Sequence, residues 1–207
     1  MSLVSKPVMA GVIAMAIVVV VSNVLVQHLF NDWLTWGAFT YPIAFLVTDL
    51  TNRALGAEKA RRVVFAGFLI GVVCSLVASQ FVNEYGDPLV TLRIAIGSGT
   101  AFLVAQLVDV AIFNRLREGT WWRAPLASSL IGSALDTALF FSIAFSATFS
   151  FIDPADPNGW ALDPVPLLGA GPVLPLWVSL AVADFAVKLV LAALALIPFR
   201  ALSARFA

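Results

Sequence analysis

The chain has 207 residues, of which 61% are hydrophobic and only 12% are charged. A soluble domain of this length could not bury so much apolar surface, so the composition excludes an ordinary soluble protein and predicts a polytopic membrane protein. The formal net charge is zero, which gives no electrostatic reason to expect nucleic acid as a partner. We expect residues 1–207 to form one transmembrane domain.

Six apolar segments meet or approach the ~20 residues that a membrane-spanning helix needs. The sequence therefore predicts an all-α protein, a bundle of six transmembrane helices. The expected helices are residues 7–28, 33–52, 62–82, 90–113, 125–149 and 172–198.

Basic residues indicate the orientation of the bundle, because Lys and Arg accumulate in cytoplasmic loops. With the N-terminus inside, the inner segments hold ten of the twelve basic residues and the outer loops hold none. The other two, Arg93 and Lys188, fall within expected helices. Both termini are therefore expected to be cytoplasmic. The inner basic residues are Lys6, Arg53, Lys59, Arg61, Arg62, Arg115, Arg117, Arg123, Arg200 and Arg205.

The second expected helix opens with Trp33 and Trp36 and carries Pro42 in its middle. The tryptophans are typical of a membrane interface, and the proline predicts a kink or a freed carbonyl. In the third helix, small residues recur every fourth position, a pattern that lets two helix backbones approach closely. Its partner is either another helix of this chain or a second copy. The small residues are Gly67, Gly71, Ser75 and Ser79.

Four carboxylates within the expected helices are the most informative residues: Asp49, Asp109, Asp136 and Asp184. One charge at a helix centre costs about 2.5–3.5 kcal/mol on the insertion scale, so such residues face a bundle interior, a partner or a wet cavity. Asp184 and Lys188 are four apart and are expected to pair. Asp109 has Lys188, Arg93 or the backbone as alternative partners. Asp136 has no cation nearby in the sequence.

Buried carboxylates of this kind suit several functions. A carboxylate in a dry pocket binds a ligand with two adjacent N–H donors, such as a guanine edge or an amine. It also suits proton coupling. The purely structural alternative is that these groups only fix helix packing, and Asp49 could be solvated at the end of its helix.

The longest loop, residues 150–171, contains four prolines and three aspartates, and we expect no regular element there. It is expected outside the membrane, where it is either a lid over a cavity or a plain connector.

Other chemistry has little support in the sequence. It contains no Walker A motif, no His/Cys cluster for a metal, and no G-x-S-x-G motif. We therefore expect no catalytic residues, no metal and no cofactor, although a membrane-embedded enzyme is kept as an alternative.

Several motifs resemble the queuosine precursor transporter family, also called the vitamin uptake transporter family. The resemblance covers about residues 33–200, and the closing Lys188 and Pro198 are part of it. The motifs are Tyr41-Pro42-x-x-Phe45-x-x-Thr48-Asp49-x-x-Asn52-Arg53-x-x-Gly56 with Ala60-Arg61-Arg62, Gln106-x-x-Asp109-x-x-x-Phe113, and Ser133-x-x-Asp136-x-x-x-Phe140.

By this resemblance, the protein is a multi-pass importer in the bacterial inner membrane, with a fold similar to the substrate-binding subunits of energy-coupling-factor transporters. Its substrate would be a 7-deazaguanine precursor of queuosine, in the cyano or aminomethyl form. We expect carboxylates to accept from the ring N–H edge, Gln106 or Asn52 to bond the carbonyl, and Phe45, Phe102, Phe113 or Phe140 to stack on the ring. The expected substrate-binding residues are Phe45, Thr48, Asp49, Asn52, Arg53, Phe102, Gln106, Asp109, Asp136, Phe140, Asp184 and Lys188.

Four hypotheses stay open on the sequence alone. The chain works as an importer, alone or as a homodimer; it is a binding subunit for this or another vitamin or nucleobase and needs a separate ATPase module; it is a membrane-embedded enzyme; or it is a packing protein that binds no ligand.

Overall fold

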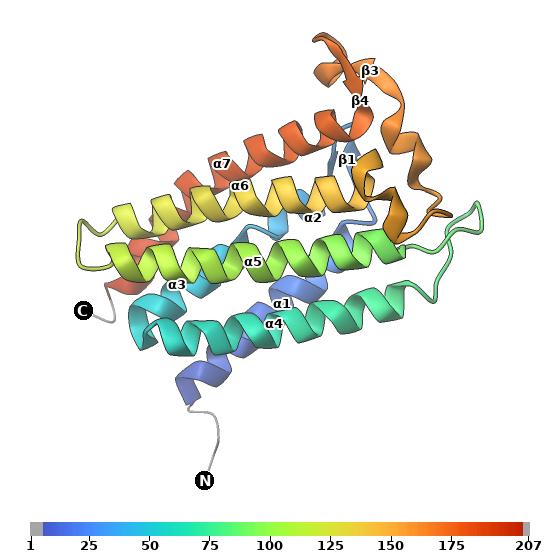
Figure 1. The fold of residues 1–207 in the computed structure, drawn as a ribbon. Helices are drawn as coiled ribbons and strands as arrows, with labels where there is room; N and C mark the ends of the chain where they lie inside the picture. The colour runs from blue at the N-terminus through green and yellow to red at the C-terminus, as the bar shows by residue number, and fades with distance from the viewer. Residues whose placement is uncertain (1–5, 205–207) are drawn as a thin grey trace.

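The computed structural model describes residues 6–204, which fold into a bundle of apolar helices (Figure 1). Within this range, five helices are long and apolar enough to cross a membrane. This confirms an all-α polytopic membrane protein. The five helices are α1 (Lys6–Leu25), α4 (Ala57–Ala78), α5 (Leu92–Leu116), α6 (Arg123–Phe145) and α7 (Leu176–Ser203).

The second expected helix, 33–52, is not continuous, which corrects the sequence prediction. A short antiparallel hairpin, β1 (Leu29–Asn31) and β2 (Leu34–Thr35), comes first and is followed by α2 (Gly37–Thr40) and α3 (Ile43–Leu55). Trp33 and Trp36 thus lie in the hairpin and just before α2. Pro42 separates the two helices, because it has no N–H to continue the ladder of α2.

The count of six spanning helices stays a prediction. With 13 residues, α3 is about 20 Å long, shorter than the ~30 Å hydrocarbon core. Gly56, at φ +86°, ends α3 and turns the chain into α4. Glycine takes this conformation without steric cost, and α4 can therefore begin at Ala57, earlier than the predicted residue 62.

The segment between α6 and α7 is more regular than the sequence predicts. It contains the 3-10 helices η1 (Ala147–Ile152), η2 (Asn158–Leu162) and η3 (Leu167–Gly169), and an antiparallel hairpin of β3 (Pro164–Pro166) and β4 (Val173–Pro175). Prolines stand at the ends of these two-stranded elements, where an edge strand tolerates them. Consequently α6 ends at Phe145 and α7 begins only at Leu176.

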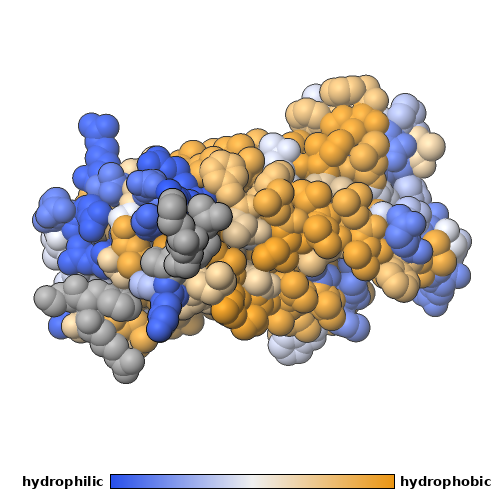
Figure 2. All heavy atoms as spheres, turned by 90° about the horizontal axis from the view of Figure 1, so that it is seen from below, coloured by the Kyte–Doolittle hydropathy of each residue, from blue (hydrophilic) through white to orange (hydrophobic). Residues whose placement is uncertain are grey.

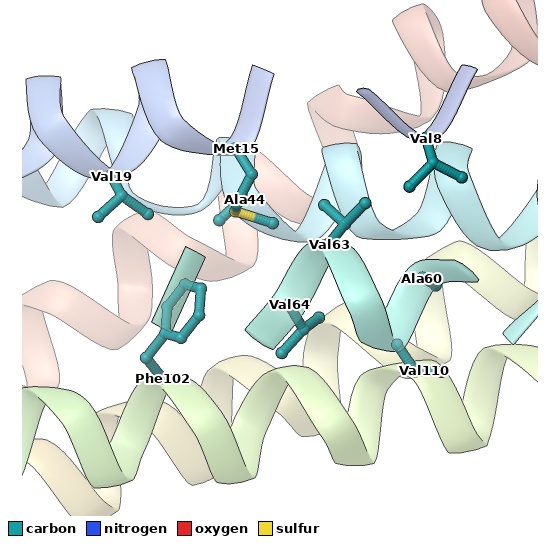
Figure 3. Close-up of a cluster of buried hydrophobic side chains, with 9 residues drawn as sticks. All are labelled: Val8, Met15, Val19, Ala44, Ala60, Val63, Val64, Phe102 and Val110. Atoms are coloured by element: carbon teal, nitrogen blue, oxygen red, sulfur yellow. The ribbon is translucent and has the colours of Figure 1, made fainter. Parts of the chain in front are cut away.

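The short helix α3 lies at the centre of the bundle and contacts α1, α4, α5, α6 and α7. Its apolar side joins a cluster in which α1, α4 and α5 also take part, with Met15, Val63 and Phe102 at its middle (Figure 3). Gly67 lets α4 pack closely against α1 in this cluster, because a Cβ at this position would be 2.6 Å from Met15 Cγ. Two of the four small residues of α4, Gly67 and Gly71, therefore lie against α1 of the same chain.

On the face drawn in Figure 2, hydrophobic residues cover the middle of the molecule and hydrophilic residues gather at its two ends. The α3–α4 turn, the α5–α6 turn and the end of α7 lie at one end, whereas both hairpins and the 3-10 helices lie at the other (Figure 1). The basic segments expected inside thus share one end. Arg205 lies outside the described residues.

Candidate functional site

The centre of the site is a polar face of α3 that is almost completely removed from solvent. Thr48, Asp49 and Asn52 are at most 1% exposed. They occupy spacings of one, three and four, which place them along one side of a helix. Buried polar groups need partners, and these come from α5 and α6.

Two hydrogen bonds join α3 to α5. The Thr48 hydroxyl donates to Gln106 Oε1 at 2.5 Å, and Asn52 Nδ2 donates to the Val110 carbonyl at 3.0 Å. The remaining amide groups, Asn52 Oδ1 and Gln106 Nε2, are buried and have no hydrogen-bond partner among residues 6–204. These two atoms can therefore still bind a small polar guest or a water molecule.

Asp49 lies between α5 and α6. The hydroxyls of Ser128 and Ser129 donate to its two carboxylate oxygens, at 3.1 and 3.3 Å. The Asp109 carboxyl from α5 is its close neighbour. Neither oxygen of Asp109 has a hydrogen-bond donor within the described part of the chain. The pairing of Asp109 with Arg93 or Lys188 that the sequence left open does not occur.

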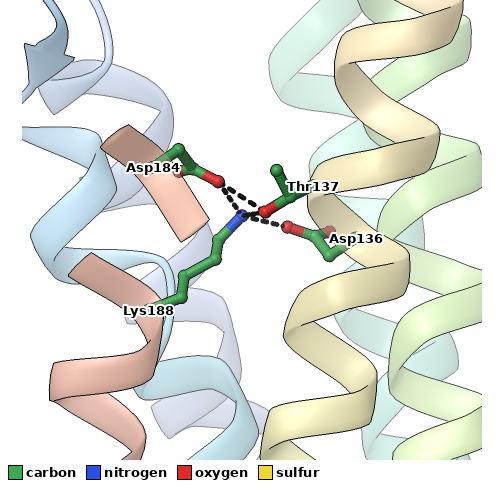
Figure 4. Close-up of polar contacts among 4 residues, drawn as sticks. All are labelled: Asp136, Thr137, Asp184 and Lys188. Carbon is green, nitrogen blue, oxygen red and sulfur yellow. Dashed lines mark hydrogen bonds and ion pairs between the residues drawn. The ribbon is translucent and has the colours of Figure 1, made fainter. Parts of the chain in front are cut away.

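A second polar cluster joins α6 to α7 around Lys188 (Figure 4). Lys188 Nζ lies 2.6 Å from Asp136 Oδ2 and 2.5 Å from Asp184 Oδ2, and it also donates to the Thr137 hydroxyl. That hydroxyl in turn donates to Asp184. The predicted Asp184–Lys188 pair is confirmed. Asp136, which has no cation near it in the sequence, finds one on another helix.

A small cavity separates the two clusters, with Asp49 on one side and Lys188 on the other. Its volume is about 10 Å³, enough for about one water molecule. A guanine-sized guest therefore requires the helices to separate. The lining residues come from the α2–α3 junction, from α3, from α6 and from α7; they are Pro42, Phe45, Leu46, Asp49, Pro125, Ser129, Ser133, Lys188, Ala192, Ala195, Leu196 and Phe199.

Among the aromatic residues proposed to stack on a ligand, Phe45 lines this cavity. Its ring lies over Gly132, where a Cβ would be only 2.6 Å from Phe45 Cε1. Phe102 belongs to the apolar cluster with α1 and α4, and Phe140 packs against Phe141 and Phe145. Phe113 touches the cavity only through Phe199, at 5.9 Å between ring centroids.

Arg53 also lies away from the cavity. Its guanidinium donates to the Arg117 carbonyl at 2.9 Å, beyond the end of α5. It therefore ties the α3–α4 turn to the α5–α6 turn and contacts none of the carboxylates of the site in the described structure.

The structure adds residues that sequence reasoning did not assign to the site. Ser128, Ser129, Thr137 and Phe199 all contact one of the two clusters or the cavity. A signal existed for α6, since Pro125, Ser129 and Ser133 recur every fourth residue and so face one side. Nothing in the sequence distinguishes Phe199 from other apolar residues of α7.

The fold and the site together define a class, that of multi-pass membrane proteins whose apolar helices enclose a small cavity lined by charged side chains. The model of the family described as "Putative vitamin uptake transporter" matches residues 35–202. The chain belongs to this family.

Three curated relatives share part of their sequence with this chain. A protein of Haemophilus influenzae named "Probable queuosine precursor transporter" is 44% identical over 138 residues, which cover 61% of this chain and 57% of the relative. The "Queuosine precursor transporter" of Escherichia coli K12 is 42% identical over 142 residues, covering 62% of this chain and 64% of the relative. A Bacillus subtilis protein with the same name as the first is 28% identical over 148 residues, with 62% of each chain covered.

The matched region thus spans about three fifths of these relatives' lengths. No solved structure matches the chain.

Proposed function

We propose that the protein imports queuosine precursors, the 7-deazaguanines with a cyano or an aminomethyl group. The observation that carries the proposal is the 42–44% identity to proteins named for this transport. The enclosed polar cavity supports it, because a pocket with carboxylate, hydroxyl and aromatic groups suits a flat, nitrogen-rich ring.

In this proposal the ring occupies an enlarged form of the cavity. Asp49 accepts from the adjacent N–H groups of the guanine-like edge, Phe45 stacks on the ring face, and Ser133 and Lys188 bind the far side. Asn52 and Gln106 do not line the closed cavity, and their free amide atoms in the α3–α5 interface would join the site when the cavity enlarges. Asp136 and Asp184 act through Lys188, whose ammonium they hold in place.

Opening of the cavity requires α7 to move in this proposal. This helix supplies Lys188, Ala192, Ala195, Leu196 and Phe199 to the lining. In its apolar 18-residue stretch, only 11% of the residues are buried, the smallest share among the five long helices. Displacing α7 therefore breaks fewer contacts than displacing α5 or α6. In the proposed orientation both termini face the cytoplasm of a bacterium, and the protein resides in the inner membrane.

The first test is ligand binding by the purified protein. A thermal-shift panel would compare cyano- and aminomethyl-deazaguanine with guanine, queuine and riboflavin. We expect a rise in the melting temperature with a deazaguanine and none with riboflavin. A shift with riboflavin alone would favour another vitamin as the substrate, and no shift with any compound would contradict the proposed function.

A matched pair of variants tests the site. Asp49→Asn keeps the shape but removes the charge, and it is expected to weaken deazaguanine binding about tenfold or more, because a hydrogen bond to a charged group contributes ~1.5–3 kcal/mol. Asp163→Asn makes the same change at an exposed residue between η2 and β3, where binding should not change. Equal affinities in the two folded variants would remove Asp49 from the site.

Transport itself separates the alternatives. Uptake of labelled deazaguanine by the purified chain in liposomes without ATP is expected, and the compound recovered inside should be chemically unchanged. Binding without uptake would instead favour a subunit that needs a separate ATPase module. A changed product would favour a membrane-embedded enzyme.

A further inference from the structure

Three pairs of polar groups lie one after another along the interface of α3 and α5. We call each pair a rung, and the middle rung is unusual. The outer rungs are ordinary hydrogen bonds, from Thr48 to Gln106 and from Asn52 to the Val110 carbonyl. The middle rung brings Asp49 to Asp109. The two carboxyls lie between these hydrogen bonds, one on each helix, and two ionised carboxylates have no hydrogen to share.

Both carboxyls of the middle rung are fully enclosed, with Asp49 1% and Asp109 0% exposed. The Ser128 and Ser129 hydroxyls donate to Asp49. Asp109 has no donor among residues 6–204, and the oxygen of Asn52 in the next rung has none either. Two adjacent negative charges in this environment would repel each other and would both have lost their hydration. The rung therefore requires one positive charge.

No basic side chain of the packed helices supplies that charge. Lys188 of α7 lines the same cavity, but its ammonium is bound to Asp136 and Asp184. The other cations of α3, α5 and α7 point elsewhere. Arg53 donates to the Arg117 carbonyl and Arg93 to the carbonyls of Ile143 and Ser146. Arg115 is exposed in the last turn of α5, and Arg200 of α7 lies over the Trp121 ring.

The other helices that pack against the rung add no cation either. On α4, Arg62 pairs with Glu58 at an exposed position, while Lys59 and Arg61 lie in the same first turns. The charged residues of α6 are Arg123 at its start and Asp136, which faces Lys188. The sole charged residue of α1 is Lys6 at its start.

A proton fits the rung better than a metal ion. A hard metal cation takes about six or more oxygen ligands. The free oxygens here are the two of Asp109 and one of Asn52, and the amide nitrogen of Gln106 lies free beside them. No group of three acidic, histidine or cysteine residues that could hold a metal occurs between residues 6 and 204. A proton needs only the two carboxyls.

We propose that the Asp49–Asp109 pair is a proton-binding site and that one proton enters through it with each substrate molecule. This inference rests on the proposed import function and adds its driving force. Asp49 lines the cavity, whereas Asp109 is not among the lining residues. A ligand that bonds Asp49 therefore changes the affinity of the pair for its proton, and by linkage the proton changes the affinity for the ligand.

The test uses the full chain in liposomes. Valinomycin in the membrane and equal potassium concentrations on both sides keep the membrane potential at zero. Exchange of labelled for unlabelled cyano-deazaguanine is measured first, because exchange requires no net proton movement. Accumulation is then measured with no gradient, with the lumen one pH unit more alkaline, and with an inward sodium gradient. For one proton per neutral substrate, the pH gradient supports up to about tenfold accumulation.

The expected result is accumulation with the pH gradient alone. In Asp109→Asn the ratio of accumulation with and without the gradient should fall to about one, because the asparagine amide replaces the exchangeable proton. Asp163→Asn should keep the wild-type ratio. The proposal would be overturned if accumulation did not depend on the pH gradient, if it depended on the sodium gradient, or if pH-driven accumulation persisted in Asp109→Asn. If no exchange occurs at all, the import function itself fails, which is a separate outcome.

A second measurement does not depend on transport. At neutral pH, the infrared spectrum of the substrate-free protein should contain the carbonyl band of a protonated carboxyl group. Asp109→Asn should lose this band and Asp163→Asn should keep it. An identical band in wild type and Asp109→Asn, or no band in wild type, would also overturn the proposal, even where Asp109→Asn transports nothing.

Discussion

Lys188 neutralises two carboxylates with one ammonium group, and this predicts a large effect of its removal. Lys188→Met retains most of the side-chain volume but leaves Asp136 and Asp184 buried without a cation. Removing one partner of a buried ion pair costs about 3–5 kcal/mol. We therefore expect the free energy of unfolding in detergent to fall by that amount, measured by denaturant titration.

The controls for Lys188 distinguish the charge from the side chain. Lys59→Met changes a half-buried lysine of α4 and is expected to alter stability by less than about 1 kcal/mol. Adding Asp136→Asn and Asp184→Asn to Lys188→Met removes all three charges and should recover most of the lost stability. A triple variant as unstable as Lys188→Met would show that shape, not charge, governs this cluster.

Gly132 sets the position of the Phe45 ring, and this can be tested with one methyl group. In Gly132→Ala the new Cβ would lie 2.6 Å from the ring, which is itself buried. The ring must then shift toward the cavity, at a cost of about 1–3 kcal/mol. We expect lower stability and loss of deazaguanine binding in the thermal-shift assay.

Gly99→Ala is the matched control for Gly132→Ala. Its Cβ would meet Phe68 at an ordinary 3.4 Å, and α5 gains a better helix former. Binding should be unchanged in this variant. If both alanine variants bind equally well, Phe45 does not limit the space for the ligand.

At the residue scale, the sequence predicted contacts within one helix better than contacts between helices. The Asp184–Lys188 pair follows from a spacing of four and was found. Asp136 reaches the same ammonium from α6, and no spacing rule relates residues on different helices. Asp109 was expected to pair with a cation in one alternative, but its neighbour is another acid. Which polar residues share an interface depends on helix rotation, which composition does not determine.

At the element scale, Thr91 connects α5 to the segment outside the bundle. Its hydroxyl donates to Asp156 at 2.8 Å, accepts from Asn158, and caps the backbone N–H of Ile94. Thr91→Val keeps the shape and removes these bonds, with an expected loss of about 1–2 kcal/mol in the free energy of unfolding. Amide hydrogen exchange should accelerate in residues 147–162 and stay unchanged in α3.

Thr120→Val provides the comparison, since Thr120 is exposed in the turn before α6. It should change neither stability nor exchange. Uniform acceleration throughout the bundle in Thr91→Val would contradict a local anchoring role for this residue.

Long helices were predictable because about 20 apolar residues leave a membrane chain few other conformations. The five long helices overlap their expected ranges, with ends that differ by a few residues. The break at Pro42 was foreseen only as a kink, and the hairpin before it was not foreseen. The composition of residues 147–175 did not predict their short strands and 3-10 helices. These elements depend on prolines at particular strand positions and on contacts such as Thr91–Asp156.

At the scale of the whole molecule, the structure represents a closed state. The cavity holds about one water molecule, and the lining is completed by α7. The proposed import requires at least two other arrangements, one open to each side of the membrane. The two ends of the bundle differ in a way that suits this, because one consists of tight basic turns and the other of two hairpins and three short helices.

The basic turns predict the orientation of the molecule in the membrane. Glu118 lies exposed in the α5–α6 turn, among Arg115, Arg117 and Arg123, whereas Asp163 is exposed at the opposite end. Positively charged segments remain cytoplasmic during insertion. In a Cys74→Ala background, we expect Asp163→Cys to react with a membrane-impermeant maleimide in intact spheroplasts. Glu118→Cys should react only after the membrane is permeabilised.

Two controls make this labelling decisive. The Cys74→Ala protein without a new cysteine should not be labelled before or after permeabilisation, and both single-cysteine variants should react fully in detergent. Labelling of Glu118→Cys but not Asp163→Cys in intact spheroplasts would invert the orientation. The description of the cavity, its carboxylates and the α7 contacts would not change. The proposed proton and substrate would then enter from the end that carries the basic turns.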